Sequence, residues 1–551
     1  MKLLAPTPPP YDPLSWVKRP LGERGRMVCE AWALQGYGTP PAVFGVYLVK
    51  ILAYVGAWIG FTTLSLGVHV ADIGSWWLSP AAFQKAILWS MLFEGMGLGC
   101  GSGPLTGRYS PPIGGVLHFL RPGTTKLPVF PSAPVLGGSR RTWLDVALYG
   151  AIVALVLRAL LAPAIDASHL IPLAVLIPLL GLADKTTFLA FRAEHYWTTI
   201  VVFTLTQDFV AGAKAVQLAL WFWAGVSKLN HHFPTVICVM TSNGPLWRIP
   251  AIRKAMYRSF PDDLRPSRLA VFLAHAGAAL EFGTPLVLAF APGGWSLTLG
   301  IALMLALHTY ITSNVPMGVP LEWNVMVVYG GFALFWAHPD VTALDVGSLP
   351  LAIFLAVMLV GVPLLGNLRP GAVSFLCAMR YYAGNWAYGV WLFRGESFRK
   401  LDKLTKAAPW VYDQLARFYD RSTAVGLVGK VLAFRLMHLH GRALPVLIPK
   451  AVEKLEDYEY LDGEIVAGMV LGWNFGDGHL HDEQLLKNVQ EQCGFAPGEL
   501  RCIFVEAQPL FGDRMGYRIH DACDGPIESG ELTVSEMRER QPWAATAEVR
   551  G

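Results

Sequence analysis

The sequence predicts an all-α polytopic membrane protein with eight to ten membrane segments and a small C-terminal α/β cytoplasmic domain. Three observations lead to this fold class. First, 53% of the 551 residues are hydrophobic and only 15% are charged, whereas soluble domains carry about 25% charged residues. Second, several apolar stretches approach the roughly 20 residues that a helix needs to cross a bilayer. Third, the last hundred residues alternate short apolar runs with polar turns, as small soluble domains do.

The predicted membrane segments are long apolar runs. They lie at 42–66, 80–98, 142–162, 168–184, 196–210, 211–230, 267–291, 295–314, 322–338 and 349–368. The segment at 196–210 is short and carries Gln207 and Asp208 near its end, so we expect it to be re-entrant or half-length. Lys and Arg cluster before the first segment and in the loops at 99–141 and 231–266, which places these regions in the cytoplasm. Both termini are then cytoplasmic if the number of spans is even.

Changes in composition predict the domain organisation. The expected parts are an N-terminal cytoplasmic and interfacial segment (1–41), a helical transmembrane domain (42–369), amphipathic interfacial helices (370–454), a small soluble α/β domain (455–530) and a loose tail (531–551). Within the small domain, "EIVAGMVLGW", "LRCIFVEAQPL" and "GYRIHDA" are typical of strands, and "HDEQLLKNVQEQC" of a helix that Asp482 caps.

Composition also excludes some classes of function. The net charge is only +4, and no basic face with interleaved aromatic residues suggests nucleic-acid binding. The seven cysteines contain no CxxC and no disulfide-like spacing. His479 and His481 in "FGDGHLHDE" are a weak metal signal, and a turn leading into a capped helix is the favoured interpretation. No metal is predicted.

The stretch "QLALWFWAGVSKLNHHF" (217–233) raises the main functional question. A solidly apolar helix ends there at Lys228. One interpretation is a lysine that snorkels to the membrane surface. The other is a buried amine, whose pKa falls with burial and which can act as a base near pH 7. The residues alone leave both open.

"WAGVSKLN" resembles the Ala-Gly-Val-x-Lys-Leu-Asp/Asn signature of vitamin K-dependent γ-glutamyl carboxylases and of their bacterial relatives with the horizontally transferred transmembrane domain. Two further stretches, "HAGAALEFGTPLVLAF" (275–290) and "ALHTYITSNVPMGVPLEWNVMVV" (306–328), are similar to that family in the same order, so the resemblance covers about 205–335. It implies that Lys228 deprotonates a reduced quinone and that His308 is its hydrogen-bonding partner or orients the quinone.

The chain departs from that family in two ways. Ser227 stands where the eukaryotic enzymes carry a second lysine, and their large lumenal domain is absent. The resemblance thus implies quinone chemistry more directly than glutamate carboxylation. The whole chain also resembles an uncharacterised family of bacterial multi-pass membrane proteins that share the Gly-rich loop and "GWNFGDGHLHDEQLL". That resemblance implies a bacterial plasma (inner) membrane and supplies no activity.

Within 205–335, His308, His275, Glu281 and Asn314 are candidates for the site in addition to Lys228. His308 lies in an apolar run, either as a satisfied core histidine or as a functional group, and Thr312 one turn on could fix its tautomer. His275 and Glu281 share a helix but lie on different faces, and both are candidates for substrate binding. Glu281 could equally serve an interhelical hydrogen bond. Asn314 is a further substrate-binding candidate, in the polar turn after His308.

A second candidate site lies at "MLFEGMGLGCGSGPLTGRYSPPIGG" (91–115). Glu94 sits in an apolar run that leads into glycines, and Arg108 follows. Backbone amides in such loops can bind anions, and Arg108, Arg121 and Lys126 could add charge for a lipid phosphate. A flexible cytoplasmic loop is the favoured interpretation, and lipid-headgroup binding is the alternative.

The sequence as a whole predicts an integral membrane protein with two open functions. One is a membrane-embedded enzyme that acts on a quinone or another lipid-soluble substrate with Lys228 as base. The alternative is a non-catalytic lipid-binding or scaffold protein of the cell envelope. Membrane lipids and a lipid-soluble small molecule are the predicted partners, and a quinone is the only cofactor that the sequence suggests.

Overall fold

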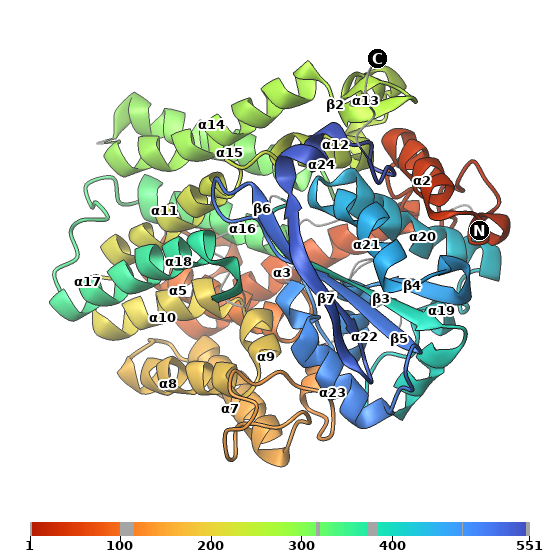
Figure 1. Cartoon of the computed structure of the whole chain (residues 1–551). Coiled ribbons are helices and arrows are strands. Elements are labelled where there is room, and N and C mark those ends of the chain that lie inside the picture. Colours follow the sequence, from red (N-terminus) through yellow and green to blue (C-terminus); the bar gives the residue numbers. More distant parts are fainter. Residues whose placement is uncertain are drawn as a thin grey trace.

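The computed structural model describes residues 3–99, 109, 115–291, 293–315, 320–372, 384–475 and 478–546. Helices make up one side of the molecule, and a β-sheet with its own covering helices lies on the other (Figure 1). The sheet is built almost wholly from the C-terminal third of the chain, coloured blue in Figure 1.

The first two thirds of the chain are helical almost throughout. The α-helices of this part are α1 Pro13–Trp16, α2 Leu21–Gln35, α3 Pro41–Leu66, α4 Ile73–Trp76, α5 Pro80–Gly95, α6 Gly115–Phe119, α7 Trp143–Leu161, α8 Ala167–Ala183, α9 Lys185–Ala190, α10 Ala193–Leu205, α11 Val210–Val226, α12 Phe233–Asn243, α13 Pro250–Ala255, α14 Arg268–Phe290, α15 Gly294–Thr312, α16 Leu321–Gly330, α17 Leu349–Ala356 and α18 Val362–Leu368. A short hairpin, β1 Tyr257–Ser259 and β2 Asp263–Pro266, precedes α14.

Polar caps explain where several of these helices begin. Ser79, Asp166 and Ser267 accept hydrogen bonds from the free backbone N–H groups at the starts of α5, α8 and α14. Thr142 and Asp145 form a reciprocal capping box at the start of α7. Such caps satisfy donors that have no partner within the helix.

Fewer helices can span a membrane than the sequence predicts. Within the described residues, five segments are long and apolar enough: Pro41–Leu66, Trp143–Leu161, Arg268–Phe290, Gly294–Thr312 and Leu349–Leu368. Arg421–Met437 and His440–Ala451 meet the criterion only together, and they are bent by 95°. The number is therefore five or six, and the prediction of eight to ten membrane segments is wrong.

The difference arises because several predicted apolar segments form helices that are short for a span: α5, α8 and α11 have 16, 17 and 17 residues. Burial also differs among the helices. Only 6% of the apolar window of α3 is buried, whereas nearly every residue of α5 after Ala81 is buried among its neighbours. The expected short segment at 196–210 is confirmed as short, since α10 has 13 residues.

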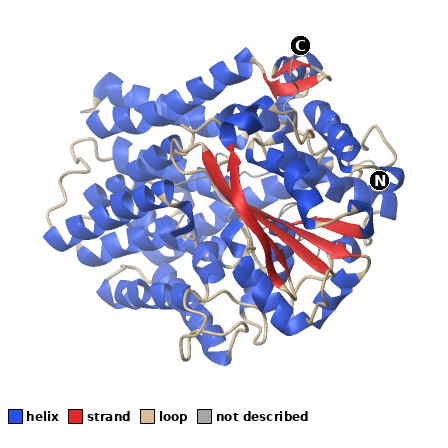
Figure 2. Cartoon of the chain, in the orientation of Figure 1, coloured by secondary structure: helices blue, strands red, loops and turns tan. Residues whose placement is uncertain are grey.

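The C-terminal part forms a five-stranded antiparallel sheet in the order β4-β3-β5-β6-β7, drawn in red in Figure 2. Its strands are β3 Tyr388–Arg394, β4 Tyr458–Asp462, β5 Leu500–Val505, β6 Arg514–Asp521 and β7 Gly525–Thr533. The helices of this part are α19 Val411–Leu415, α20 Arg421–Met437, α21 Leu444–Ala451, α22 Gly463–Val470, α23 Glu483–Cys493 and α24 Val534–Glu539. Strands β3 and β5 are buried, and β6 alternates buried and partly exposed residues, as a strand with one solvated face does.

Several sequence predictions for this part are confirmed. β5 and β6 lie in the two stretches expected to form strands at the end of the domain, and α23 begins at the Asp482 cap. The expected strand in "EIVAGMVLGW" is wrong, because residues 463–470 form α22 with Asp462 as its cap. A short run that is apolar on all sides suits a buried helix as well as a buried strand.

Basic residues in the expected interfacial helices have internal partners. α20 is buried along almost its whole length. Arg435 donates to Asp462 and Glu464, and Lys430 donates to the carbonyl oxygens of Thr7 and Tyr37. These charges thus hold α20 to the N-terminal segment and to the sheet instead of anchoring it at a lipid surface.

The expected loose tail is packed as far as the structure describes it. Val534 and Met537 of α24 are buried. Gln541 is 1% exposed; its side chain donates to Asp263 and accepts from the backbone N–H of Leu264. This contact joins the tail to the β1–β2 hairpin. The sequence of the tail, which is rich in Glu and Arg, does not predict this contact.

Candidate functional site

Lys228 lies in the tight connection between α11 and α12. The backbone N–H of Lys228 donates to the carbonyl of Gly225, and that of Leu229 to Val226, so α11 closes with a final turn. α12 then begins at Phe233 with Pro234 in its first turn, where proline fits well. The lysine side chain therefore leaves a rigid helix end and not a long loop.

The Lys228 amine forms an ion pair with Glu281, in the middle of α14. The two side chains are 12% and 6% exposed. Gly225 makes this approach possible, because a Cβ atom there would lie 3.2 Å from ring carbons of Phe282. Close packing of α11 on α14 at this glycine thus brings a lysine and a glutamate from distant parts of the sequence together.

Within the described chain, two other buried lysines, Lys85 and Lys214, bond only to backbone carbonyls, whereas Lys126 is paired with the Asp145 carboxylate. Lys85 donates to carbonyl oxygens at the end of α7, among them Leu160 and Ala162. Lys214 of α11 donates to the carbonyls of His338 and Val341. Those amines bond to backbone carbonyls at or after the C-terminal ends of helices, where basic groups are favourable. Lys228 instead faces a carboxylate at a cavity, so the snorkelling interpretation does not describe it.

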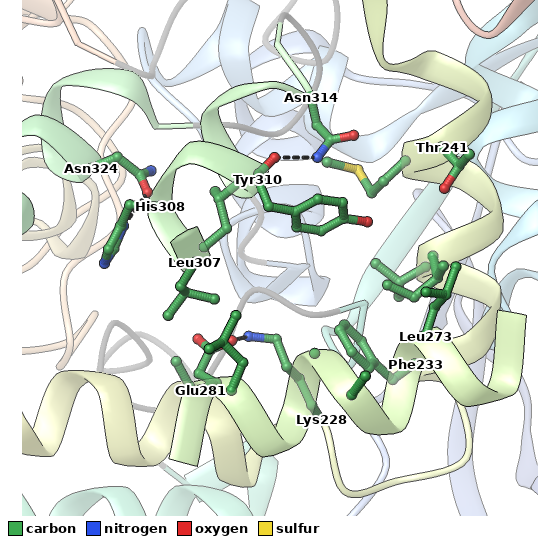
Figure 3. A pocket seen from close by; sticks show the side chains of 18 of the residues that line it. Lys228, Phe233, Thr241, Leu273, Glu281, Leu307, His308, Tyr310, Asn314 and Asn324 are labelled. Carbon is green, nitrogen blue, oxygen red and sulfur yellow. Dashed lines mark hydrogen bonds and ion pairs between the residues drawn. The ribbon is translucent and has the colours of Figure 1, made fainter. Parts of the chain in front are cut away.

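A cavity of about 520 Å³ lies beside this ion pair (Figure 3). Its walls come from α11, α12, α14, α15 and the start of α16, together with the segment between α12 and α14. Most of the lining is apolar or aromatic, with few polar side chains; the polar and aromatic members are Trp221, Lys228, Phe233, Thr241, Trp247, Glu281, His308, Tyr310, Asn314, Trp323 and Asn324. A mainly apolar cavity with a few convergent polar groups is the usual form of a small-molecule site.

His308 lines the same cavity, and both of its ring nitrogens are bonded to protein. Trp221 Nε1 donates to Nε2 at 2.9 Å, so Nε2 is an acceptor. Nδ1 lies 2.7 Å from Asn324 Oδ1, and the Asn324 amide nitrogen donates to the carbonyl of Pro320. This network assigns the neutral Nδ1–H tautomer to His308.

This network changes the predicted role of His308. The partner of the Lys228 amine is Glu281 and not His308, so the expected contact between Lys228 and His308 is not present among the described residues. Thr312 does not fix the tautomer either, since its hydroxyl donates to the backbone carbonyl of His308. The imidazole holds α11, α15 and α16 together around the cavity.

Part of the cavity wall reaches the molecular surface. Leu273 on α14 and Tyr310 on α15 line the cavity and are also 38% and 37% exposed. α14 and α15 are two of the five helices able to span the membrane. Two exposed residues of the cavity wall thus lie on helices that are long and apolar enough to span a membrane.

The other predicted site residues lie in different places. Asn314 and Glu281 line the cavity, whereas His275 is exposed on α14 and is not part of its wall. Glu94 is buried in α5 on the far side of α16, where Lys50 and Glu322 form an ion pair at 2.6 Å. Arg108 lies outside the described residues.

The expected lipid-phosphate site around the Gly-rich loop loses one of its cations. Lys126 is buried and donates to both carboxylate oxygens of Asp145, so it cannot face a lipid headgroup. Arg121 donates to the carbonyl of Lys406. These contacts show that at least Lys126 serves the packing of the loop onto α7.

The two histidines near the C-terminal domain also have structural surroundings. His479 Nε2 lies 3.0 Å from the Glu506 carboxylate, and His481 is buried against Gly389 and Gly463. Within the described ranges, no group of three His, Cys, Asp or Glu side chains is close enough to hold a metal ion.

The Lys228–Glu281 pair brings two opposite charges to the cavity wall. The amine and the carboxyl group of this pair can bind one more proton. This holds whether the pair is an ammonium with a carboxylate or a neutral amine with a carboxylic acid. The pair can therefore accept one proton from a ligand and retain a positive charge beside the anion that forms. Sequence reasoning missed the pairing, although two opposite charges in apolar helices of one membrane protein are expected to meet.

The comparisons with known proteins agree with a membrane protein of open function. A family model described as a transmembrane protein of unknown function (DUF3556) matches residues 1–550. No curated protein and no solved structure matches the chain. Because the family model spans nearly the whole sequence, the chain belongs to the DUF3556 family of transmembrane proteins of unknown function.

Proposed function

We propose that this protein is a membrane-embedded enzyme that takes a proton from a lipid-soluble substrate bound in the α11–α15 cavity. The Lys228–Glu281 ion pair on the cavity wall is the observation that carries the proposal. A buried charge pair stabilises a fold poorly compared with apolar packing. A pair that faces an apolar cavity is therefore better explained by chemistry than by stability.

The proposed step moves one proton. The O–H bond of a weakly acidic ligand breaks, the Lys228–Glu281 pair takes the proton, and the electron pair stays on the ligand oxygen. The positive charge that the pair then bears stabilises this oxyanion, because few water molecules screen charges in an apolar cavity. Lys228 serves as the base in the sense that the resemblance implies, with Glu281 as its proton-sharing partner.

The identity of the ligand rests on the resemblance to quinone-using carboxylases. A hydroquinone has the weakly acidic O–H and the apolar body that the cavity suits, and it dissolves in the membrane. The "WAGVSKLN" stretch contains the lysine of the ion pair, and "ALHTYITSN" supplies His308 and Asn314 of the cavity wall. We place this enzyme in a bacterial plasma membrane.

Complementation of a strain that lacks the gene tests the proposal. Lys228→Met alone leaves the Glu281 carboxylate without its partner, so the paired variant Lys228→Met/Glu281→Gln keeps the cavity neutral. Lys214→Met is the matched control, because Lys214 is a second buried lysine of α11 that bonds only to backbone carbonyls. We expect Lys228→Met and the paired variant to lose function at normal protein levels, and Lys214→Met to retain it.

Full function of the paired variant would overturn the enzyme proposal. It would favour the alternative of a non-catalytic lipid-binding or scaffold protein, for which the shape of the cavity matters and the charge pair does not. Binding of a short-chain hydroquinone to the purified protein separates these cases further. The enzyme proposal expects binding that weakens when the charge pair is removed.

A further inference from the structure

The end of the cavity away from Lys228 holds a second polar group whose hydrogen-bonding capacity is not met. Asn314 is 1% exposed, and its amide nitrogen donates to the carbonyl of Tyr310 at 2.8 Å. This bond fixes the orientation of the amide, because a carbonyl accepts only from the nitrogen. Asn314 Oδ1 is then turned away from Tyr310, toward the side where Thr241 lies (Figure 3). It has no hydrogen-bond partner among the described residues.

A donor with the same property lies next to this acceptor. The indole Nε1 of Trp247 is buried and has no partner within the part of the chain that the structure describes. A Cβ atom on Gly244 would lie 2.8 Å from Trp247 Cδ1, which adjoins Nε1, and 3.1 Å from Asn314 Oδ1. The two groups are therefore close neighbours, and both line the cavity. Buried polar groups without partners are rare and costly unless a ligand or water completes them.

These two groups lie apart from the ion pair. Glu281 and Lys228 lie at one end of the cavity, and Asn314, Tyr310 and Thr241 at the other (Figure 3). The wall between them is apolar, with Leu273, Leu280 and Leu307 among its residues.

We infer that the ligand of this cavity has two polar ends: a weakly acidic group at Lys228–Glu281, and a hydroxyl or primary amide at Asn314–Trp247. This inference rests on the proposed function and adds the second end. A hydroxyl donates its proton to Asn314 Oδ1 and accepts from Trp247 Nε1, so one group satisfies both. A plain hydrocarbon tail would leave both groups desolvated without partners.

A series of synthetic phenols tests the inference. The probes are 4-alkylphenols with chains of four to twelve carbons and the same phenols with a hydroxyl on the last carbon. Their dissociation constants are measured with the full-length protein in nanodiscs, by isothermal titration calorimetry. The quantity compared is the ratio of the two constants at each chain length. Partitioning of the probes into lipid affects this ratio equally in every variant.

For the native protein, we expect the terminal hydroxyl to favour binding about tenfold at the chain length that spans the cavity, relative to the ratio in Asn314→Leu. Trp247→Phe removes the donor and keeps an aromatic ring, so it should lower the ratio in part. Gly244→Ala places a methyl group 2.8 Å from Trp247 Cδ1, so the indole ring must shift, and it should abolish the preference; its φ of −58° leaves the backbone unstrained. This variant also covers the case in which Asn314→Leu fails to fold.

Equal ratios in the native protein and these variants at every chain length would overturn the inference, as would a lack of saturable binding by the hydroxylated probes. Failure of the proposed function has a different signature. The paired variant Lys228→Met/Glu281→Gln should weaken binding of both probes and leave their ratio unchanged. If both affinities are the same with and without the charge pair, the proposed function fails, whatever the ratio.

Discussion

Lys228 at the end of α11 and Glu281 in the middle of α14 form a buried ion pair that faces a largely apolar cavity. The pair joins two helices that are far apart in the sequence, and it lies beside a histidine whose nitrogens are both bonded to other groups. The Lys–Glu pair is thus the proton acceptor that we propose for the cavity, and His308 is part of the frame that shapes it.

The ion pair should show strong coupling in stability. Lys228→Met leaves a buried carboxylate unpaired, and Glu281→Gln leaves a buried ammonium unpaired. Each is expected to lower the free energy of unfolding by about 3–5 kcal/mol. The paired variant loses both charges and should fall by much less than the sum of the single effects. Denaturant unfolding in detergent measures all four proteins, and additive losses would contradict the buried pair.

The His308 network should respond to the loss of its acceptor. Asn324→Leu leaves the Nδ1–H of His308 without a partner in an apolar place, at a cost of about 1–3 kcal/mol. Asn367→Leu is the matched control, because Asn367 is also buried and also donates to a proline carbonyl four residues earlier, that of Pro363. Nitrogen-15 spectra should show His308 in the Nδ1–H tautomer, and a signal from the Nε2–H form would contradict the network.

The α14–α15 hairpin should cross the membrane and return. Lys254 and Arg258 lie in the basic segment before α14, so this side is expected to be cytoplasmic. Trp295, at the start of α15, is 79% exposed and should lie on the opposite side. Single cysteines at Lys254 and Trp295, with the seven native cysteines replaced by serine, report this with a membrane-impermeant thiol reagent. Labelling of both positions from one side would refute a spanning hairpin.

Much of the site was accessible from the sequence, but its connections were not. Lys228, Glu281, His308 and Asn314 were all predicted as site residues, and all four line the cavity. The pairing of Lys228 with Glu281 depends on how α11 packs on α14, which Gly225 decides through its contact with Phe282. A periodic apolar pattern reveals the helices and not which of their faces meet.

The sequence also predicts the overall fold only in part. The prediction of a membrane protein is confirmed, whereas the predicted number of spans is too high because α5, α8 and α11 are apolar but have only 16 or 17 residues. Strand β3 was missed because "YGVWLFR" mixes aromatic residues with arginine, as interfacial segments do. Strand β7 was missed because an exposed edge strand such as "GPIESGELT" carries charges in place of an apolar face.

The C-terminal sheet should lose stability in acid through Glu506. Burial alone would raise the pKa of this carboxyl, but the hydrogen bond and charge of His479, the backbone N–H of Ala507 and the charge of Arg518 together outweigh burial and lower the pKa from 4.5 to about 2. A carboxyl whose pKa is lower in the folded state stabilises the fold above pH 4.5, and this contribution is lost as the pH falls toward 2. Hydrogen exchange of strand β5, which ends one residue before Glu506, measures the local stability. We expect Glu506→Gln to flatten its decline between pH 5 and pH 2, whereas Glu531→Gln, which breaks an exposed pair with Arg514, should leave the decline unchanged. The same decline in Glu506→Gln as in the native protein would show that His479 and Glu506 do not interact as charges.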